Sequence, residues 1–230
     1  MKNKILISLL LLLTFFAFAG SALLPGPESS IAMISKIIKE VNYKSAEISN
    51  WEKAKLGTPL GNGDGVKTGK RSIAVVEFLD GSLLRVRPET EIEIYGEPKD
   101  GKQNKETEIK SGVVQFEITQ QKDEEFKFTT PTGLASIRGT SGFFKVGDEE
   151  TILVVEKGII DVLGKGGLKE KGTVEAGKTA YISANGSVKI QKTPDNLLNE
   201  LKKVKSAKTV KYIIETDDGE YEIEVLEEIK

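Results

Sequence analysis

The chain of 230 residues contains neither cysteine nor histidine. It can therefore form no disulfide, it has no thiolate nucleophile, and it lacks the ligands of Cys/His zinc sites. Histidine is also the most frequent general acid or base in enzymes. A serine or threonine nucleophile would need lysine as its base, and no Ser-x-x-Lys sequence stands at the start of an expected helix. We therefore expect no enzymatic activity, no metal and no cofactor.

An excess of charge of either sign is also missing. The 33 Lys and Arg residues nearly balance the 35 Asp and Glu residues, which leaves a formal net charge of -2. A chain with mixed and nearly balanced charges has no electrostatic reason to bind nucleic acid. We expect no nucleic-acid partner.

The N-terminus has the three parts of an export signal. A segment made basic by Lys2 and Lys4 precedes an apolar run, Ile5–Ala19, which ends in an Ala-x-Ala cleavage sequence. The run of about 15 residues is shorter than the roughly 20 that span a bilayer comfortably. The sequence thus predicts a signal peptide at 1–19, with a retained N-terminal anchor as the alternative, followed by a linker at 20–30. The protein is then periplasmic or secreted, in contact with membrane only if the segment is retained, and not a lipoprotein because it has no cysteine.

From Ile31 onward, short apolar runs alternate with Gly, Asp and Asn at intervals of roughly 8 to 12 residues. This pattern predicts an all-β domain over 31–192, built as a sandwich, a roll or a β-helix-like stack of many short strands. The clearest hairpin joins Ile73–Leu79 to Leu83–Arg87 through Asp80-Gly81-Ser82. By contrast, the stretch 97–108 is almost entirely polar, and we expect a solvated loop there.

The pattern changes after Pro194. Asp195 can cap a helix from Asn196 to about Lys205, in which four apolar residues share one face: Leu197, Leu198, Leu201 and Val204. Two alternating runs around Asp217-Asp218-Gly219 then predict a β-hairpin. Residues 193–230 are therefore expected to form a helix plus β-hairpin appendage, either a separate module or a flap on the main sheet.

Gly-anchored turns follow one another in a fixed order between Gly63 and Tyr181. They are Gly63-Asp64-Gly65-Val66-Lys67-Thr68-Gly69, Asp80-Gly81-Ser82, Thr130-Pro131-Thr132-Gly133, Arg138-Gly139-Thr140, Glu156-Lys157-Gly158 and Glu175-Ala176-Gly177. This order resembles the FecR domain family, and the resemblance extends back to Ile31 through Met33-Ile34-Ser35-Lys36-Ile37 and Trp51-Glu52-Lys53-Ala54. It implies structural turn roles for Gly63, Asp64, Thr68, Gly69, Asp80, Gly81, Ser82, Pro131, Gly133, Gly139, Thr140, Gly158 and Gly177.

The turn at Arg138-Gly139-Thr140 is the most specific of these elements. Arg138 either hydrogen-bonds carbonyl or carboxylate groups to hold a strand crossing, or contacts a partner. The family usually places Phe within a residue or so of the Gly-Thr pair, whereas here Ser141-Gly142 intervenes before Phe143. We therefore expect a slightly different corner at this point.

FecR regulators combine a cytoplasmic anti-sigma segment, one membrane span and a periplasmic domain that receives a signal. Only four residues precede the apolar run here, so the resemblance implies the extracytoplasmic part alone. The resulting hypothesis is a binding or sensing module that docks to another envelope protein, plausibly through an exposed strand edge. Because Trp and Arg are enriched in binding hot spots, the candidate contacts are Trp51, Arg85, Arg87 and Arg138, although Trp51 also fits a core or rim position.

An alternative is a wall-associated protein that binds polysaccharide or has a structural role in the envelope. One Trp and five Tyr offer few aromatic platforms for sugars. Glu91 and Glu93 could suggest a glycosidase pair, but they alternate with Ile92 and Ile94, which is typical of the solvated side of a sheet.

Overall fold

The computed structural model describes residues 30–48, 50–99, 102–120, 126–205, 208–216 and 219–227. The predicted signal peptide at 1–19 lies outside the described residues, as does the linker apart from Ser30. Among the described residues, no helix is long and apolar enough to cross a membrane.

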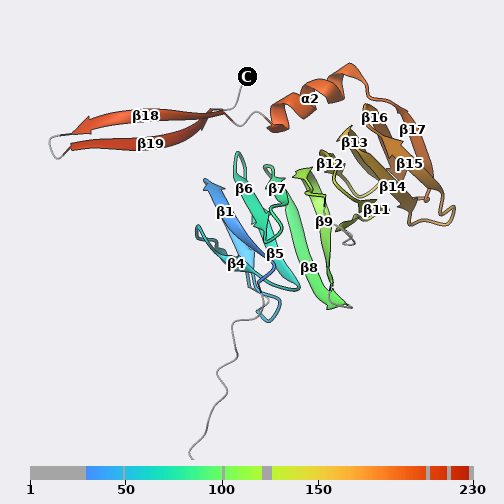
Figure 1. The fold of residues 1–230 in the computed structure, drawn as a ribbon, viewed down its shortest axis with the longest axis horizontal. Helices are drawn as coiled ribbons and strands as arrows, with labels where there is room; N and C mark the ends of the chain where they lie inside the picture. The colour runs from blue at the N-terminus through green and yellow to red at the C-terminus, as the bar shows by residue number, and fades with distance from the viewer. Residues whose placement is uncertain are drawn as a thin grey trace, which may run out of the picture.

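Seventeen strands form one connected sheet system that folds into two layers (Figure 1). In spatial order, the first layer consists of β4 (Pro59–Leu60), β1 (Ala32–Ile38), β6 (Ile73–Phe78), β7 (Leu83–Val86), β9 (Lys102–Glu117), β12 (Ser141–Val146), β13 (Glu150–Lys157), β16 (Lys178–Ser183) and β17 (Val188–Lys192). The second layer consists of β3 (Glu52–Lys53), β2 (Val41–Lys44), β5 (Asp64–Thr68), β8 (Glu91–Lys99), β9 again, β10 (Phe126–Thr129), β11 (Gly133–Ile137), β14 (Ile159–Gly164) and β15 (Lys171–Glu175). The predicted all-β class is confirmed.

Strand β9 belongs to both layers. Its residues up to Ser111 pair with β8, and its residues from Gly112 pair with β12. Gly112 has a φ of 98°, and a Cβ at this position would collide with Thr90. A residue without a side chain is thus required where the strand passes from one layer to the other.

The core lies between the layers and is centred on five phenylalanines. Phe78, Phe116 and Phe144 come from the first layer, whereas Phe126 and Phe128 come from the second. Their ring centroids lie 4.9 to 5.4 Å apart. Such spacing is favourable for aromatic pairs, so these rings join the two sheets into one core.

The expectation of a solvated loop at 97–108 is wrong. Strand β8 continues to Lys99 and β9 begins at Lys102, with cross-strand pairs between the described residues of the stretch. Two charged side chains are buried here: those of Lys105 and Asp80 are only 4% and 8% exposed. Their burial is possible because they form an ion pair at 2.7 Å. Pairing within the sheet and a buried ion pair replace the apolar residues that usually mark a strand.

Helix α2 (Asp195–Lys205) packs on the outer face of the first layer. Leu197 and Leu201 are buried against Phe143 and Val154, while Leu198 is half-buried. The predicted helix is confirmed, and it covers the main sheet; the side chain of Val204 lies outside the described part. The predicted hairpin is also present, with β18 (Lys208–Thr216) and β19 (Gly219–Glu227) forming a separate two-stranded sheet (Figure 1).

Candidate functional site

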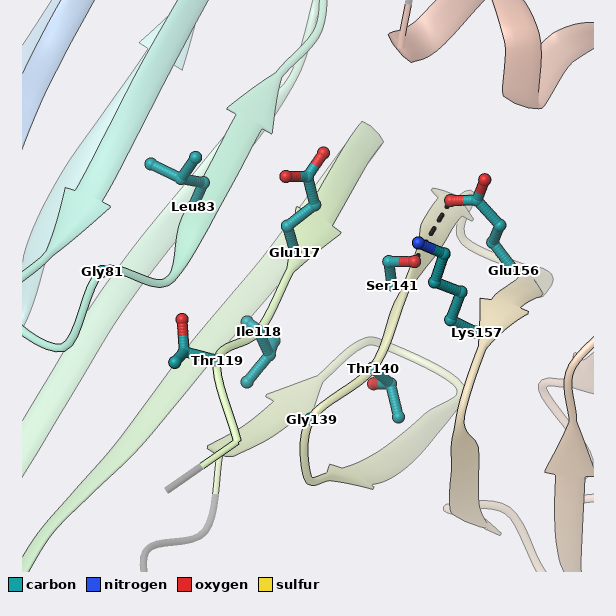
Figure 2. A pocket seen from close by; sticks show the side chains of 10 residues that line it. All are labelled: Gly81, Leu83, Glu117, Ile118, Thr119, Gly139, Thr140, Ser141, Glu156 and Lys157. Carbon is teal, nitrogen blue, oxygen red and sulfur yellow. Dashed lines mark hydrogen bonds between the residues drawn. The ribbon is translucent and has the colours of Figure 1, made fainter.

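A pocket of about 360 Å³ lies where four neighbouring strands of the first layer end or begin, β7, β9, β12 and β13. We call it the turn pocket. It is lined by Gly81, Leu83, Glu117, Ile118, Thr119, Gly139, Thr140, Ser141, Glu156 and Lys157 (Figure 2). Three turns that are far apart in the sequence, at Gly81, Gly139 and Lys157, therefore meet at one place.

The first of these turns is held by its own polar groups. Gly81 has a φ of 80°, and its N–H donates to the carbonyl of Phe78 at 2.9 Å. The Asp80 carboxylate accepts the N–H of Ser82 at 2.8 Å, and Ser82 Oγ accepts the N–H of Thr119 at 3.1 Å. The Asp80-Gly81-Ser82 turn is thus fixed to the end of β9.

The other two turns pack against each other. Gly139 has a φ of 62°, and a Cβ there would lie 2.7 Å from Cβ of Gln120. Gly158 has a φ of 83°, and a Cβ there would collide with Cγ2 of Thr140. Both positions require glycine because the backbone conformation and the space exclude a side chain.

Thr140 lies between these two glycines and is only 3% exposed. Among the described residues, its Oγ1 is buried without a hydrogen-bond partner. The methyl group of Thr140 faces Gly158. The contact of this methyl group, rather than a hydrogen bond of the hydroxyl, therefore explains why threonine suits this position. A buried hydroxyl without a partner is unusual in a folded protein.

The corner that departs from the family pattern contains a β-bulge. The register between β12 and β13 shifts between Ser141 and Gly142, which leaves Glu156 as the extra residue. Ser141 Oγ donates to the Glu156 carboxylate at 3.1 Å (Figure 2). The bulge re-aims Glu156 toward the turn pocket, as bulges commonly do beside functional sites.

Charged groups of both signs surround the turn pocket. Arg85 donates to Glu117 at 2.8 Å and to Gln115 at 2.6 Å across β7 and β9. Glu156 and Lys157 stand on the other side of the pocket (Figure 2). No group of three or more acidic residues within the described part of the chain could hold a metal ion. The arrangement suits polar contacts with a ligand or a partner rather than a known catalytic mechanism.

Two of the four candidate contact residues lie next to lining residues of the turn pocket, although neither lines it itself. Arg85 reaches it through Glu117, and Arg138 directly precedes the lining residue Gly139. The side chain of Arg138 is exposed, and no hydrogen bond or ion pair joins it to another described residue. Arg87, by contrast, is half-buried at the opposite end of β7.

Trp51 lies on the second layer, away from the turn pocket. It is half-buried, and a Cβ at Gly65 would lie 2.9 Å from its ring. The ammonium groups of Lys44 and Lys67 lie 5.2 and 5.6 Å from its ring centroid, within the range of cation–π interactions. Trp51 is thus a rim residue rather than part of the main core.

Ion pairs continue from Trp51 across the outer face of the second layer. Lys44 pairs with Glu93 at 3.2 Å, Lys67 with Glu91 at 2.8 Å, and Lys110 with Glu93 at 3.2 Å. We call Trp51 and these five charged residues the Trp51 face. Ile92 and Ile94 are fully buried, so the prediction that Glu91 and Glu93 lie on the opposite side of the strand is confirmed.

The pKa values of Glu93, on the Trp51 face, and of its neighbour Tyr95 are both shifted. Partial burial raises the pKa of Glu93, but hydrogen bonds from Tyr95, Lys44 and Lys110 outweigh burial and hold the pKa below its usual value. Burial and the hydrogen bond to Glu93 raise the pKa of Tyr95 to about 12. Both groups keep their usual charge states at neutral pH.

The remaining turn residues have structural roles of two kinds. Gly63 and Gly177 adopt positive φ values of 83° and 77°. Gly69 and Gly133 do not, but a Cβ would lie 2.8 Å from Glu40 Oε2 and 2.9 Å from Ile182 Cγ2 respectively. Close approach, rather than backbone conformation, explains glycine at these two positions.

Three polar or rigid residues complete this set. The Asp64 carboxylate accepts the N–H groups of Ala46 at 2.9 Å and Gly61 at 2.8 Å. Thr68 Oγ1 donates to the carbonyl of Arg87 at 2.5 Å and is buried. Pro131 is exposed in the turn between β10 and β11.

Sequence reasoning missed the contribution of Glu117, Thr119 and Ser141 to the turn pocket. Apolar and polar residues alternate within both Leu83–Arg87 and Val113–Ile118. This alternation places Arg85 and Glu117 at outward positions of their strands, so it could have indicated that the two side chains pair. Arg85 and Glu117 can be paired only if β7 and β9 are known to be neighbouring strands, and the sequence does not show this.

Comparisons with known proteins agree with this architecture. Residues 64–161 match the model of a family described as FecR protein. Two crystal structures of a "putative anti-sigma factor" from Parabacteroides distasonis have a TM-score of 0.50 and 15% identity, covering 66% of this chain and 68% of that chain. At this identity the likeness concerns the fold alone. No curated protein matches the chain.

Proposed function

Because residues 64–161 match the FecR family model, we propose that the protein is a non-enzymatic, extracytoplasmic binding or sensing module that docks to another envelope protein at the turn pocket. The observation that carries this proposal is the convergence of three family-type turns on one pocket. The export signal expected at 1–19 supports a location outside the cytoplasm.

The strands beneath the turn pocket favour recognition by side chains. β7, β9, β12 and β13 each have a neighbouring strand on both sides. Their backbone groups are therefore occupied, and a partner strand cannot add to the sheet at this point. Docking at a strand edge would instead use β15 or β17. Each is the outermost strand at one side of its layer and is longer than β3 and β4, the outermost strands at the other side.

The charges at the turn pocket suit a protein surface of mixed charge. Arg138 is exposed beside the pocket, and arginine is enriched among residues that dominate binding energy. Glu117 is 41% exposed, so its carboxylate can reach a partner while it pairs with Arg85. A volume of about 360 Å³ admits a single protruding side chain of the partner.

Polysaccharide binding is the second candidate, and Trp51 is the residue that favours it. An aromatic ring on a sheet surface can stack on a sugar. However, the strand at Gly65 lies against the ring, and two lysines lie near it. This environment leaves less of the ring available than a sugar platform needs.

Site-specific photo-cross-linking tests the proposal in cells that produce the full chain. A photoreactive amino acid replaces Arg138 in one variant and Arg71 in the control. Arg71 is also an exposed arginine in a turn, but it precedes β6, whereas the turn pocket lies beyond the end of β6. We expect one dominant envelope protein to be linked at position 138 and not at position 71.

The captured protein must then bind the purified full chain in solution. Equal cross-linking from both positions, or enrichment of cell-wall glycan without protein, would refute docking at the turn pocket. Enrichment of glycan that depends on Trp51 would support the polysaccharide alternative.

A further inference from the structure

Strand β17 has an open edge. Within the described residues it pairs with β16 on one side and with no strand on the other. At its two ends, the carbonyl of Ser187 accepts the N–H of Ser183 and the N–H of Thr193 donates to the carbonyl of Gly177. Because backbone groups alternate sides along an antiparallel strand, those of Val188, Ile190 and Lys192 point toward the open edge.

Part of this edge is already capped. The N–H of Val188 donates to the Glu170 carboxylate at 2.8 Å, which leaves the region of Ile190 and Lys192 to receive another strand. The exposed charges of β17 are Lys189 and Lys192, and the strand contains no acidic residue. Apart from the Glu170 carboxylate that caps Val188, the charges along the open edge are therefore basic.

The C-terminal hairpin has the opposite charge. Strands β18 and β19 pair with each other along nine residues, and the described sheets contain no other partner for them. Strand β19 carries four glutamates, Glu220, Glu222, Glu224 and Glu227, and no basic residue. An isolated two-stranded hairpin is at best marginally stable in water, so this element needs a further contact.

The register of the hairpin places its apolar positions together. Val210 lies opposite Val225, Tyr212 opposite Ile223, and Ile214 opposite Tyr221. Positions directly opposite in an antiparallel pair lie on one face of the sheet, so these six apolar residues occupy positions on a single face. Glu220, Glu222 and Glu224 occupy the other face of β19.

We propose that β19 of a second copy of this chain adds to the open edge of β17, so that two copies exchange their C-terminal hairpins. In β17, Val188 and Ile190 pack on the core while Lys189 and Gln191 are exposed. The alternation of apolar residues and glutamates in β19 matches this pattern, and its acidic face lies beside Lys189, whereas Lys192 alternates to the other face of β17.

The chain itself indicates a second copy as the occupant, since it carries both the basic edge and the acidic strand. With a two-fold axis, β19 of each copy pairs with β17 of the other copy, so both open edges of β17 are occupied. Two-fold symmetry is the usual symmetry of a homodimer. The open edge of β15 is a poorer match, because this strand contains both Lys171 and Glu175. Charge complementarity therefore selects β17.

Sedimentation velocity of the purified full chain over a wide concentration range tests the proposal. We expect a reversible dimer. Reversal of charge in Lys189→Glu with Lys192→Glu should weaken dimerisation by roughly tenfold. Glu222→Lys with Glu224→Lys should weaken it similarly, and the combination of both pairs should restore it.

The matched control reverses Lys169 and Lys171 to glutamate. These exposed lysines flank the open edge of β15, so their reversal should leave dimerisation unchanged. A chain that is monomeric at every concentration, or a dimer insensitive to the reversals in β17, would overturn the proposal.

A cysteine pair distinguishes exchange between copies from closure within one chain. The chain has no cysteine, so Gln191→Cys with Glu222→Cys introduces the sole thiols. We expect oxidation to give a disulfide-linked dimer on a denaturing gel. A disulfide confined to single chains would show that each hairpin folds back onto its own β17, which contradicts the proposal.

Discussion

The turn pocket and the Trp51 face differ in how their polar groups are satisfied. On the Trp51 face each charged residue pairs with an oppositely charged residue on another strand, as Lys44 does with Glu93 and Lys67 with Glu91. Beside the turn pocket, Arg138 is exposed without a bond to a described residue, and Thr140 Oγ1 is buried without a hydrogen-bond partner among the described residues. A surface that satisfies its own charges offers less to a partner, so the comparison favours the turn pocket as the docking surface.

The two regions also differ in what stabilises them. The turn beside the pocket is joined to the second layer by the buried Asp80–Lys105 pair, whereas the pairs of the Trp51 face are partly exposed. Exposed ion pairs contribute little to stability, but loss of one partner from a buried pair is costly. Substitutions near the turn pocket should therefore have the larger effects.

The largest expected effect follows from Asp80→Asn. The substitution removes the carboxylate that pairs with the buried Lys105 ammonium group, and it should lower the free energy of unfolding by roughly 3 to 5 kcal/mol. Urea denaturation monitored by Trp51 fluorescence measures the change. The double variant Asp80→Asn with Lys105→Met should recover much of the loss; equal stability of wild type and Asp80→Asn would contradict a buried pair.

Gly158→Ala comes next. The new methyl group must adopt a positive φ and overlaps Thr140, so we expect a loss of roughly 2 to 4 kcal/mol in the free energy of unfolding. Gly177→Ala is the matched control, because Gly177 has a φ of 77° but a Cβ there would meet no atom within 4 Å. It should lose only about 1 to 2 kcal/mol; equal losses would show that the contact with Thr140 carries no energy.

The sequence predicted elements whose signals are local. The Asp80-Gly81-Ser82 hairpin needs only Gly at a positive φ between two apolar runs, and helix α2 needs a cap and one apolar face. The resemblance to the FecR family, read from the order of the turns, is confirmed over residues 64–161. In each case neighbouring residues carry the information.

The failures concern contacts between distant residues. The polar sequence around Lys105 predicts a loop, because the sequence does not show that Asp80 lies 2.7 Å from the Lys105 ammonium group. Likewise, the passage of β9 between layers depends on the fit of Gly112 against Thr90. The turn pocket could not be predicted for the same reason, since its three turns meet only after the layers have formed.

The smallest expected effect is on the Trp51 face. The pKa of Glu93 lies below its usual value in the folded chain, so its contribution to stability is present above the usual pKa of 4.5 and is lost as the pH falls through the folded pKa. Glu93→Gln should reduce the loss of stability in this acidic range by less than about 1 kcal/mol. Thermal unfolding between neutral and acidic pH measures the difference; an unchanged pH dependence would show that Glu93 is not coupled to folding.

The central claim is that the turn pocket, and not the Trp51 face, contacts the partner. The most direct test measures the affinity of the captured envelope protein for two variants with matched substitutions, Arg85→Ala with Arg138→Ala at the turn pocket, and Lys44→Ala with Lys67→Ala at the Trp51 face. We predict a loss of roughly tenfold or more for the first variant and little change for the second. Full affinity of the first variant together with loss in the second would contradict the account.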